Sequence, residues 1–208
     1  EIKTKLISDS LVIWAELESQ IDITAFFIFV SNVIAKIHKI GNVVTRGCIA
    51  NGDHFSNEQI WISKVFVESY KGESEAIYPR TILLPSAMSR IKCLNQDLLN
   101  NEFWIKTDID GFSFINYLNV ISEDCQIVDG KILANGWTTA SPNNQILIED
   151  IKRHKETIRN GFKTSLTDQK TRGKYFWLAN YHNNFVKNNA FLNEIDDLQI
   201  NLKSLEFN

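Results

Sequence analysis

The stretch that decides the fold is "LISDSLVIW", residues 6–14. It places the small polar triplet Ser8-Asp9-Ser10 between two apolar runs with the β-branched and aromatic content of strands. Because Asp and Ser close tight turns by bonding their own backbone, the triplet predicts the tip of a β-hairpin. The Asp9 carboxylate then has two interpretations. It only closes the turn, or it stands at a strand end to hold a hard cation such as Mg²⁺.

After this hairpin, short strands are predicted to alternate with helices. Apolar residues recur at helical spacing after Asp22, which we expect to cap a helix that ends at Gly41. Pro79, early in an apolar run, indicates an edge strand or the first residues of a strand. Asp110-Gly111 predicts a hairpin turn. The other predicted elements are a strand over 42–52, a polar arm or loop over 53–59, a helix over 60–74 and a helix over 86–101 capped by Ser86.

The last third of the chain changes character. From about Gln145 it is predicted to form two long helices, 145–164 and 169–188, followed by a polar tail. The order of elements indicates an α/β or α+β fold with mixed strands. We expect a single domain over 1–208, with 145–208 as a helical C-terminal extension.

Composition excludes several classes of protein. A net charge of −3 and a pI near 5.8 do not favour non-specific nucleic-acid binding. Cys48, Cys93 and Cys125 form no CxxC pair, so a reducing cytoplasm is expected rather than a disulfide framework. No apolar run approaches the roughly 20 residues of a membrane span, and no signal peptide is found. Because the first segment already reads as a strand and begins with Glu, we expect the native start to lie upstream.

Other candidate residues leave alternatives open. Arg46 interrupts an apolar strand, so its partner is either a structural carboxylate or a bound anion. Tyr175, Trp177 and Tyr181 form an aromatic stripe at helical spacing, which favours a core position over a base-stacking platform. The four histidines at 38, 54, 154 and 182 lack metal-ligand spacing, so surface or core-edge roles are expected. There is no P-loop, Rossmann turn or nucleophile elbow.

Five blocks in order carry a resemblance to a known family. They are "LISDSLVIW" (6–14), "GNVVTRGCIANGDHF" (41–55), "FVESYKGESEAIYPRTILL" (66–84), "DIDGFSFINYL" (108–118) and "KYFWLANYHN" (174–183). Together they resemble the bacterial pyrimidine nucleotide cyclases of the Pycsar antiphage systems, divergent members of the class III adenylate/guanylate cyclases. The resemblance implies an α+β fold: a ferredoxin-like βαββαβ core with a mixed, mostly antiparallel sheet and additional C-terminal helices. It also implies a head-to-tail homodimer with active sites at the interface.

The resemblance also implies roles for particular residues. Asp9 would bind the metals, and Lys5, Ser10 and Arg46 would contact the substrate. As a donor only, Lys5 suits a base carbonyl, although it also fits a solvated strand end. Arg46 and Lys71 would serve catalysis. Purine cyclases place an asparagine and an arginine on the helix after the "RG" strand. Here those positions hold Val67 and Lys71, and Ser63 stands where relatives tend to have Gly.

The activity implied is a phosphorus–oxygen lyase that converts UTP or CTP to the 3′,5′-cyclic monophosphate (cUMP or cCMP) and pyrophosphate, with two Mn²⁺ or Mg²⁺ ions. Such a site needs a second metal carboxylate, which we expect on a strand before Glu1. Two alternatives stay open: cyclisation of ATP or GTP, and a catalytically inactive homologue that binds nucleotide as a sensor. The product would be an alarm signal during phage infection.

Overall fold

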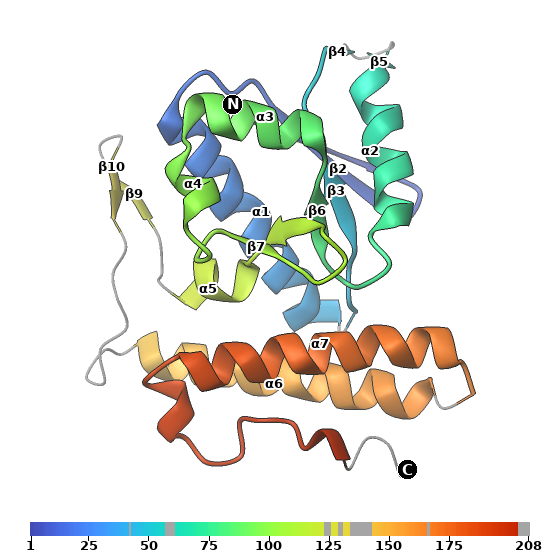
Figure 1. The fold of residues 1–208 in the computed structure, drawn as a ribbon, viewed down its shortest axis with the longest axis vertical. Coiled ribbons are helices and arrows are strands. Elements are labelled where there is room, and N and C mark those ends of the chain that lie inside the picture. The colour runs from blue at the N-terminus through green and yellow to red at the C-terminus, as the bar shows by residue number, and fades with distance from the viewer. Residues whose placement is uncertain are drawn as a thin grey trace.

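The computed structural model describes residues 1–41, 43–56, 61–122, 126–128, 131–133, 143–165 and 167–203. Helices and short strands are mixed along the chain, which confirms the predicted α+β class with C-terminal helices (Figure 1). The strands are β1 (Ile2–Ile7), β2 (Ser10–Ala15), β3 (Gly47–Ile49), β4 (His54–Ser56), β5 (Trp61–Ser63), β6 (Thr81–Leu83), β7 (Ile105–Thr107), β8 (Ser113–Ile115), β9 (Gln126–Val128) and β10 (Lys131–Leu133). The helices are α1 (Gln20–Gly41), α2 (Lys64–Glu75), α3 (Pro85–Leu94), α4 (Asp97–Asn100), α5 (Tyr117–Ser122), α6 (Asn143–Thr164), α7 (Gln169–Asn188) and the 3-10 helix η1 (Leu192–Glu194).

The largest sheet has four strands in the order β3-β6-β8-β7. β3 pairs parallel with β6, and the β6–β8 and β7–β8 pairs are antiparallel, so the sheet is mixed and mostly antiparallel. β6 is an inner strand of this sheet, so of the two alternatives for Pro79 the edge strand is wrong, and the alternative of a position at the start of a strand is close to what the structure contains. Pro79 comes two residues before β6 begins, so its missing N–H removes no ladder hydrogen bond. The predicted hairpin around Gly111 is confirmed as β7–β8, and the φ of +84° at Gly111 is one that glycine tolerates.

β1 and β2 form the hairpin that the sequence predicts. Ile7 pairs with Ser10, which leaves Ser8 and Asp9 as a two-residue turn with a φ of +55° at Ser8. The hairpin forms a separate two-stranded sheet. It is less buried than its apolar residues led us to expect, because Leu6 is 72% exposed and Leu11 42%.

α1 begins with a reciprocal cap. The backbone N–H of Asp22 donates to the Ser19 hydroxyl at 3.2 Å, and the N–H of Ser19 donates to Asp22 Oδ2 at 2.9 Å. Asp22 is thus the third residue of the helix rather than its N-cap, and the predicted cap was three residues late. The predicted end at Gly41 is confirmed. Ile23 and Phe27, on the inner face of α1, belong to the central core.

α2 and α3 have different kinds of N-terminus. Ser63 caps α2, since its hydroxyl accepts from the N–H of Phe66 at 3.0 Å. The predicted helix over 60–74 therefore begins later, after β5, which pairs with β4 to form the arm expected near 53–59. α3 begins at Pro85 without a side-chain cap. Ser86 is not the cap; its hydroxyl accepts from the backbone of Asn51 and donates to Glu68.

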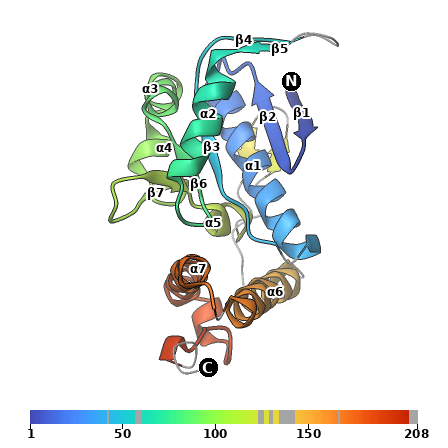
Figure 2. The same cartoon turned by 90° about the vertical axis from the view of Figure 1, so that its right-hand side faces the viewer.

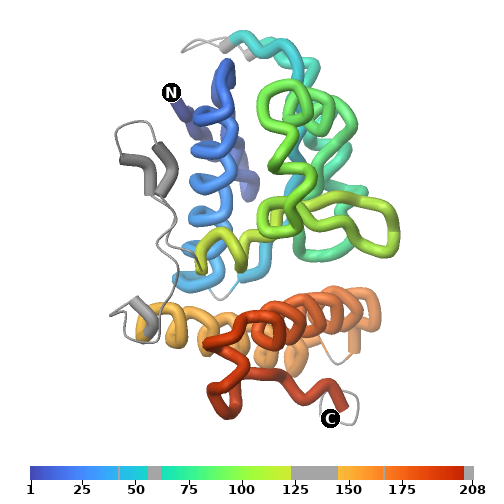
Figure 3. Tube along the Cα trace, turned by 60° about the vertical axis from the view of Figure 1, so that its left-hand side comes forward, coloured from blue at the N-terminus to red at the C-terminus, as the bar shows by residue number. Residues whose placement is uncertain are grey.

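The two long C-terminal helices are confirmed, and α7 has both of its predicted ends. α6 and α7 run side by side beneath the rest of the fold (Figures 1 and 2). The helices approach closely at Gly161, where an added Cβ would lie 2.0 Å from Cζ of Tyr175. The chain after α7 returns along the far side of this pair (Figure 3). There Lys155 donates to Asp197 Oδ1 at 2.8 Å. The helix pair is therefore attached both to the core and to the C-terminal segment.

α1 is the one helix in the described part of the chain with the length and apolar composition of a membrane span, although the sequence predicted none. Half of its most apolar window is buried against the rest of the protein. Its buried face contains Phe26, Phe27 and Val30, which belong to the central cluster. In the described structure, α1 therefore packs as a helix of the central core.

Candidate functional site

Asp9 lies at the exposed tip of the β1–β2 hairpin. Ser10, half-buried, is the first residue of β2, and Lys5 is an exposed residue of β1 opposite Val12. The hairpin thus brings together three of the predicted site residues. Across the described ranges, no group of three or more His, Cys, Asp or Glu side chains is placed to hold a metal ion.

Arg46 and Lys71 belong to a second place in the fold. Arg46 immediately precedes β3, and its Nε lies 2.6 Å from Oε1 of Glu73 on α2. Of the two partners considered for Arg46, the structure contains the carboxylate. Both side chains are about one-third exposed, so solvent screens the pair and little stability depends on it. Lys71 is exposed on α2, two residues before Glu73. Among the described residues, no ion pair joins either cation to Asp9.

A cleft of about 750 Å³ separates the hairpin from the main sheet. Its walls include Trp14 on β2 and Ile49 on β3, and α1 contributes Phe26 and Phe27. In the described part of the chain, β2 pairs only with β1, and β3 pairs only with β6. Among the described residues, each strand therefore has one edge without a strand partner (Figure 2). Residues of both strands line the cleft. Unpaired edges beside an apolar wall are the features to which an added strand binds.

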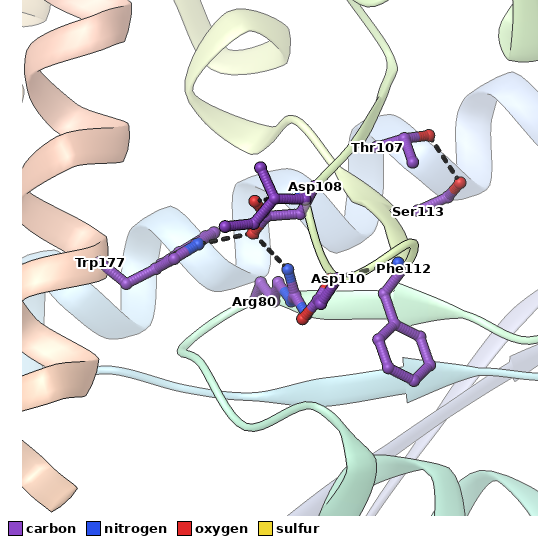
Figure 4. Close-up of polar contacts among 8 residues, drawn as sticks. Arg80, Thr107, Asp108, Asp110, Phe112, Ser113 and Trp177 are labelled. Carbon is purple, nitrogen blue, oxygen red and sulfur yellow. Dashed lines mark hydrogen bonds and ion pairs between the residues drawn. The ribbon is translucent and has the colours of Figure 1, made fainter.

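Arg80 forms a buried ion-pair network that sequence reasoning did not identify, although it lies in the quoted "YPR" segment. Its guanidinium donates to both Asp108 and Asp110 in the β7–β8 loop (Figure 4). The indole Nε1 of Trp177 on α7 donates to Asp108 Oδ2 at 2.6 Å (Figure 4). The loop is thereby fixed to β6 on one side and to α7 on the other.

The surroundings of Arg80 explain why this cation tolerates burial. Its guanidinium carbon lies 5.2–5.7 Å from the ring centroids of Tyr78, Phe112, Phe114 and Trp177. Burial raises the pKa of Asp110, but hydrogen bonds from Arg80 and from the backbone, together with the arginine charge, bring that pKa below its ordinary value. Both carboxylates are already satisfied by the protein, so we interpret this network as structural.

A second polar network joins three of the four histidines inside the protein. Tyr117 Oη lies 2.6 Å from His154 Nε2 and 3.4 Å from His38 Nδ1. His154 Nδ1 lies 3.0 Å from His182 Nδ1, and His182 Nε2 lies 2.9 Å from the carbonyl oxygen of Leu198. The chain of contacts therefore connects α1, α5, α6, α7 and the C-terminal segment.

The Leu198 carbonyl fixes the proton positions along this network, because it can only accept. With neutral rings, His182 carries its proton on Nε2 and accepts at Nδ1 from His154. His154 then accepts from Tyr117, whose oxygen is left to accept from His38 Nδ1. His38 Nε2 is consequently an acceptor, and it has no hydrogen-bond partner among the described residues.

Burial keeps these rings neutral. It lowers the pKa of His38 to about 4 and, with smaller contributions from its neighbours, that of His182 to about 4. For His154, burial and the two other histidines hold the pKa well below its usual value. The surface or core-edge roles expected for His38, His154 and His182 are therefore wrong. Each of these histidines lies three or four residues from apolar core positions of a predicted helix. This spacing was the sequence signal that could have indicated their burial.

The predicted aromatic stripe of α7 is confirmed as part of the core for Tyr181, and Trp177 packs against that core while partly buried, but Tyr175 is half-buried and lies outside the core cluster. Tyr181 is buried, and its hydroxyl donates to Asn116 Oδ1 at 2.8 Å. Trp177 is stacked between Tyr78 and Tyr181, with centroid separations of 5.5 Å on both sides.

Comparison of the chain with protein-family models, with curated proteins and with solved structures found no match.

Proposed function

We propose that the protein is a cytoplasmic nucleotidyl cyclase that converts UTP or CTP to the 3′,5′-cyclic monophosphate and pyrophosphate. The observation that carries the proposal is the exposed Asp9 turn beside a cleft between two strands with unpaired edges. In the reaction, the ribose 3′-oxygen attacks the α-phosphorus and pyrophosphate leaves. Two Mg²⁺ or Mn²⁺ ions would supply charge stabilisation on the attacking and leaving oxygens. Asp9 would be one of their ligands.

The cleft between β2 and β3 supports the expected second carboxylate. A strand inserted there would pair with β2 on one side and β3 on the other, and its inward side chains would cover Phe26 and Phe27. The sheet would then run β1-β2-added strand-β3-β6-β8-β7, the neighbour order of a ferredoxin-like core whose first strand lies between its third and fourth. A strand as long as β2 would reach the Ser8-Asp9 turn, where its carboxylate would meet Asp9.

Exposed apolar side chains support a homodimer in which each site is completed by the partner. Val67 is 50% exposed and Tyr70 62% exposed on α2, next to Lys71. Leu6 and Leu11 are exposed beside the Asp9 turn. Burying these two patches against each other would bring Lys71 of one subunit toward Asp9 of the other, where an ammonium group offsets triphosphate charge. This arrangement accounts for the separation of the two candidate groups within one chain.

The direct test incubates the full-length protein with each of the four nucleoside triphosphates and Mn²⁺, and identifies products by mass spectrometry. We expect a cyclic pyrimidine nucleotide and pyrophosphate. Asp9→Asn should abolish product while the dimer mass and the far-UV circular dichroism stay unchanged. Asp196→Asn, which removes an exposed carboxylate in the C-terminal segment, is the matched control and should retain activity.

Other results of the same assay separate the alternatives. Formation of cAMP or cGMP alone would identify a purine cyclase and refute the pyrimidine assignment. Nucleotide binding without any product would identify a sensor and refute the enzyme. Full turnover by Asp9→Asn would show that the metal ligand lies elsewhere.

A further inference from the structure

A second cavity, of about 670 Å³, lies where α1, α5 and α6 meet, and no step of the proposed reaction uses it. From its walls, its charges and its polar base, we propose that it binds a small amphipathic anion: a phosphate, carboxylate or sulfonate group on a flat apolar body. The volume lies within the range of cavities that hold small organic ligands, roughly 300–1,000 Å³. This inference does not rest on the cyclase proposal.

The walls of the cavity are mostly aliphatic. α1 and α5 contribute two of these side chains each and α6 contributes three, which are Ala35, Ile40, Leu118, Ile121, Ile146, Leu147 and Ile151. Ile40 is 74% exposed and Ile146 53% exposed, so a large apolar surface meets water at this place. Covering that surface with the body of a ligand is favourable in proportion to the apolar area removed from water.

The charged side chains of the cavity select the sign of the ligand. Lys39 Nζ lies 2.6 Å from Asp150 Oδ1, so these two charges offset each other. Lys36 and Arg153, from facing helices, also line the cavity and form no ion pair with any described residue. Two uncompensated cations beside apolar walls favour an anion and oppose a metal ion.

The polar base of the cavity is formed by His38, Tyr117 and His154 of the buried network. The rings are neutral, so they neither repel nor attract the anionic group at long range. The open position in their hydrogen-bond chain is the acceptor His38 Nε2. An acceptor that is buried without a donor costs free energy.

Two fluorescent probes of similar shape test the proposal. 8-Anilinonaphthalene-1-sulfonate has an aromatic body, an N–H donor and an anionic group, whereas N-phenyl-1-naphthylamine lacks only the sulfonate. We expect the sulfonate to bind the native protein at one site. Lys36→Gln/Arg153→Gln should weaken its binding by about tenfold or more, because charge-assisted hydrogen bonds are lost, and should leave the uncharged probe within about twofold.

Matched variants keep the result interpretable. Lys152→Gln removes an exposed cation from the same helix that does not line the cavity, and it should leave both affinities unchanged. Ala35→Phe fills the cavity without changing charge and should remove binding of both probes. Near-UV circular dichroism confirms that each variant is folded. Phenyl phosphate and benzoate should displace the sulfonate, and the one that does so at lower concentration identifies the preferred anionic group.

Three results would overturn the proposal. The first is equal loss of sulfonate binding in Lys152→Gln, which means attraction to the surface charge as a whole. The second is binding to folded Ala35→Phe with the parent affinity. The third is the absence of sulfonate binding to the native protein. Because none of these measurements involves nucleotide turnover, failure here is distinguishable from failure of the cyclase proposal.

Discussion

Acidification from pH 7 to pH 5 should destabilise this protein strongly, through the buried histidine network. His38, His154 and His182 are neutral in the folded state and become accessible to protons on unfolding. A histidine whose folded pKa is depressed contributes stability that is complete above its unfolded pKa. That contribution is lost as the pH falls toward the folded pKa. The window here runs from about 6.5 down to about 4.

The magnitude follows from these two pKa values. For one histidine with a pKa of about 6.5 unfolded and about 4 folded, the loss between pH 7 and pH 5 is about 2 kcal/mol. His38 and His182 together therefore lose about 4 kcal/mol. His154 adds to the loss in the same direction, since burial and its two histidine neighbours oppose its protonation. The sum is a large part of the roughly 5–15 kcal/mol that stabilises a domain.

Other charged groups do not obscure this window. Lys155 lowers the pKa of His182 further, which acts in the same direction. The pKa is also lowered for four carboxyl groups, those of Asp22, Asp110, Asp168 and Asp197. A depressed carboxyl pKa gives stability that is lost only as the pH falls below its ordinary value of about 4. The change in unfolding free energy between pH 7 and pH 5 therefore reports mainly the protonation of the buried histidines.

The assay is guanidinium chloride unfolding at pH 7, 6 and 5, followed by tryptophan fluorescence. His38→Gln keeps a donor toward Tyr117 but cannot take up the proton, so it should reduce the dependence of the unfolding free energy on pH by about 1 kcal/mol per pH unit below pH 6. His54→Gln changes the histidine outside the network, and its unfolding is measured beside that of His38→Gln as the matched control. An unfolding free energy that is constant from pH 7 to pH 5, or an unchanged slope in His38→Gln, would refute the reasoning.

Two further predictions concern packing and thiol reactivity. Gly161→Ala should lower the unfolding free energy by about 1–3 kcal/mol, because the new Cβ would meet the Tyr175 ring. Gly173→Ala lies on the next helix with open space around it, so it should instead raise the unfolding free energy by about 0.5–1 kcal/mol. Thermal unfolding of both variants distinguishes the two effects. Equal shifts of the melting temperature would contradict the packing at Gly161. Cys93 is exposed and should react with iodoacetamide in the native protein, whereas Cys48 should react slowly, because burial and nearby carboxylates raise its pKa to about 12. Peptide mass spectrometry after timed alkylation measures both rates, and equal labelling would contradict this environment for Cys48.

Features encoded by neighbouring residues could be predicted from the sequence. The Ser8-Asp9 turn, the end of α1 at Gly41 and both ends of α7 were found from turn chemistry, glycine placement and helical periodicity. The errors at Asp22 and Ser86 concern which of several polar residues bonds a helix terminus. The Ser86 hydroxyl, which does not cap α3, forms hydrogen bonds with Asn51 and Glu68 on other segments. Local patterns therefore predict that an element exists better than they predict how it begins.

Features that depend on distant residues could not be predicted. The carboxylate that pairs with Arg46 belongs to Glu73, 27 residues away, so sequence spacing could not identify it. The histidine network joins residues from α1, α6 and α7, and no sequence spacing brings them together. The turn position of Asp9 was found from a short motif, but its metal-binding role is a proposal that no neighbouring residue decides. The proposed partner strand rests on the cleft between β2 and β3, which follows from the sheet topology and not from sequence spacing.

The two buried networks attach the C-terminal helices to the core by chemically different means. Arg80 and Trp177 hold the β7–β8 loop against α7, and this attachment includes the Arg80–Asp110 pair, in which the pKa of Asp110 lies below its ordinary value. Tyr117 and His154 hold α5 against α6, and this attachment requires neutral imidazoles. Acid therefore weakens one attachment while the other persists. The cavity between α1, α5 and α6 is lined by Tyr117 and His154 of the acid-sensitive attachment. As the pH is lowered, anion binding should therefore be lost at a higher pH than the contact at Trp177.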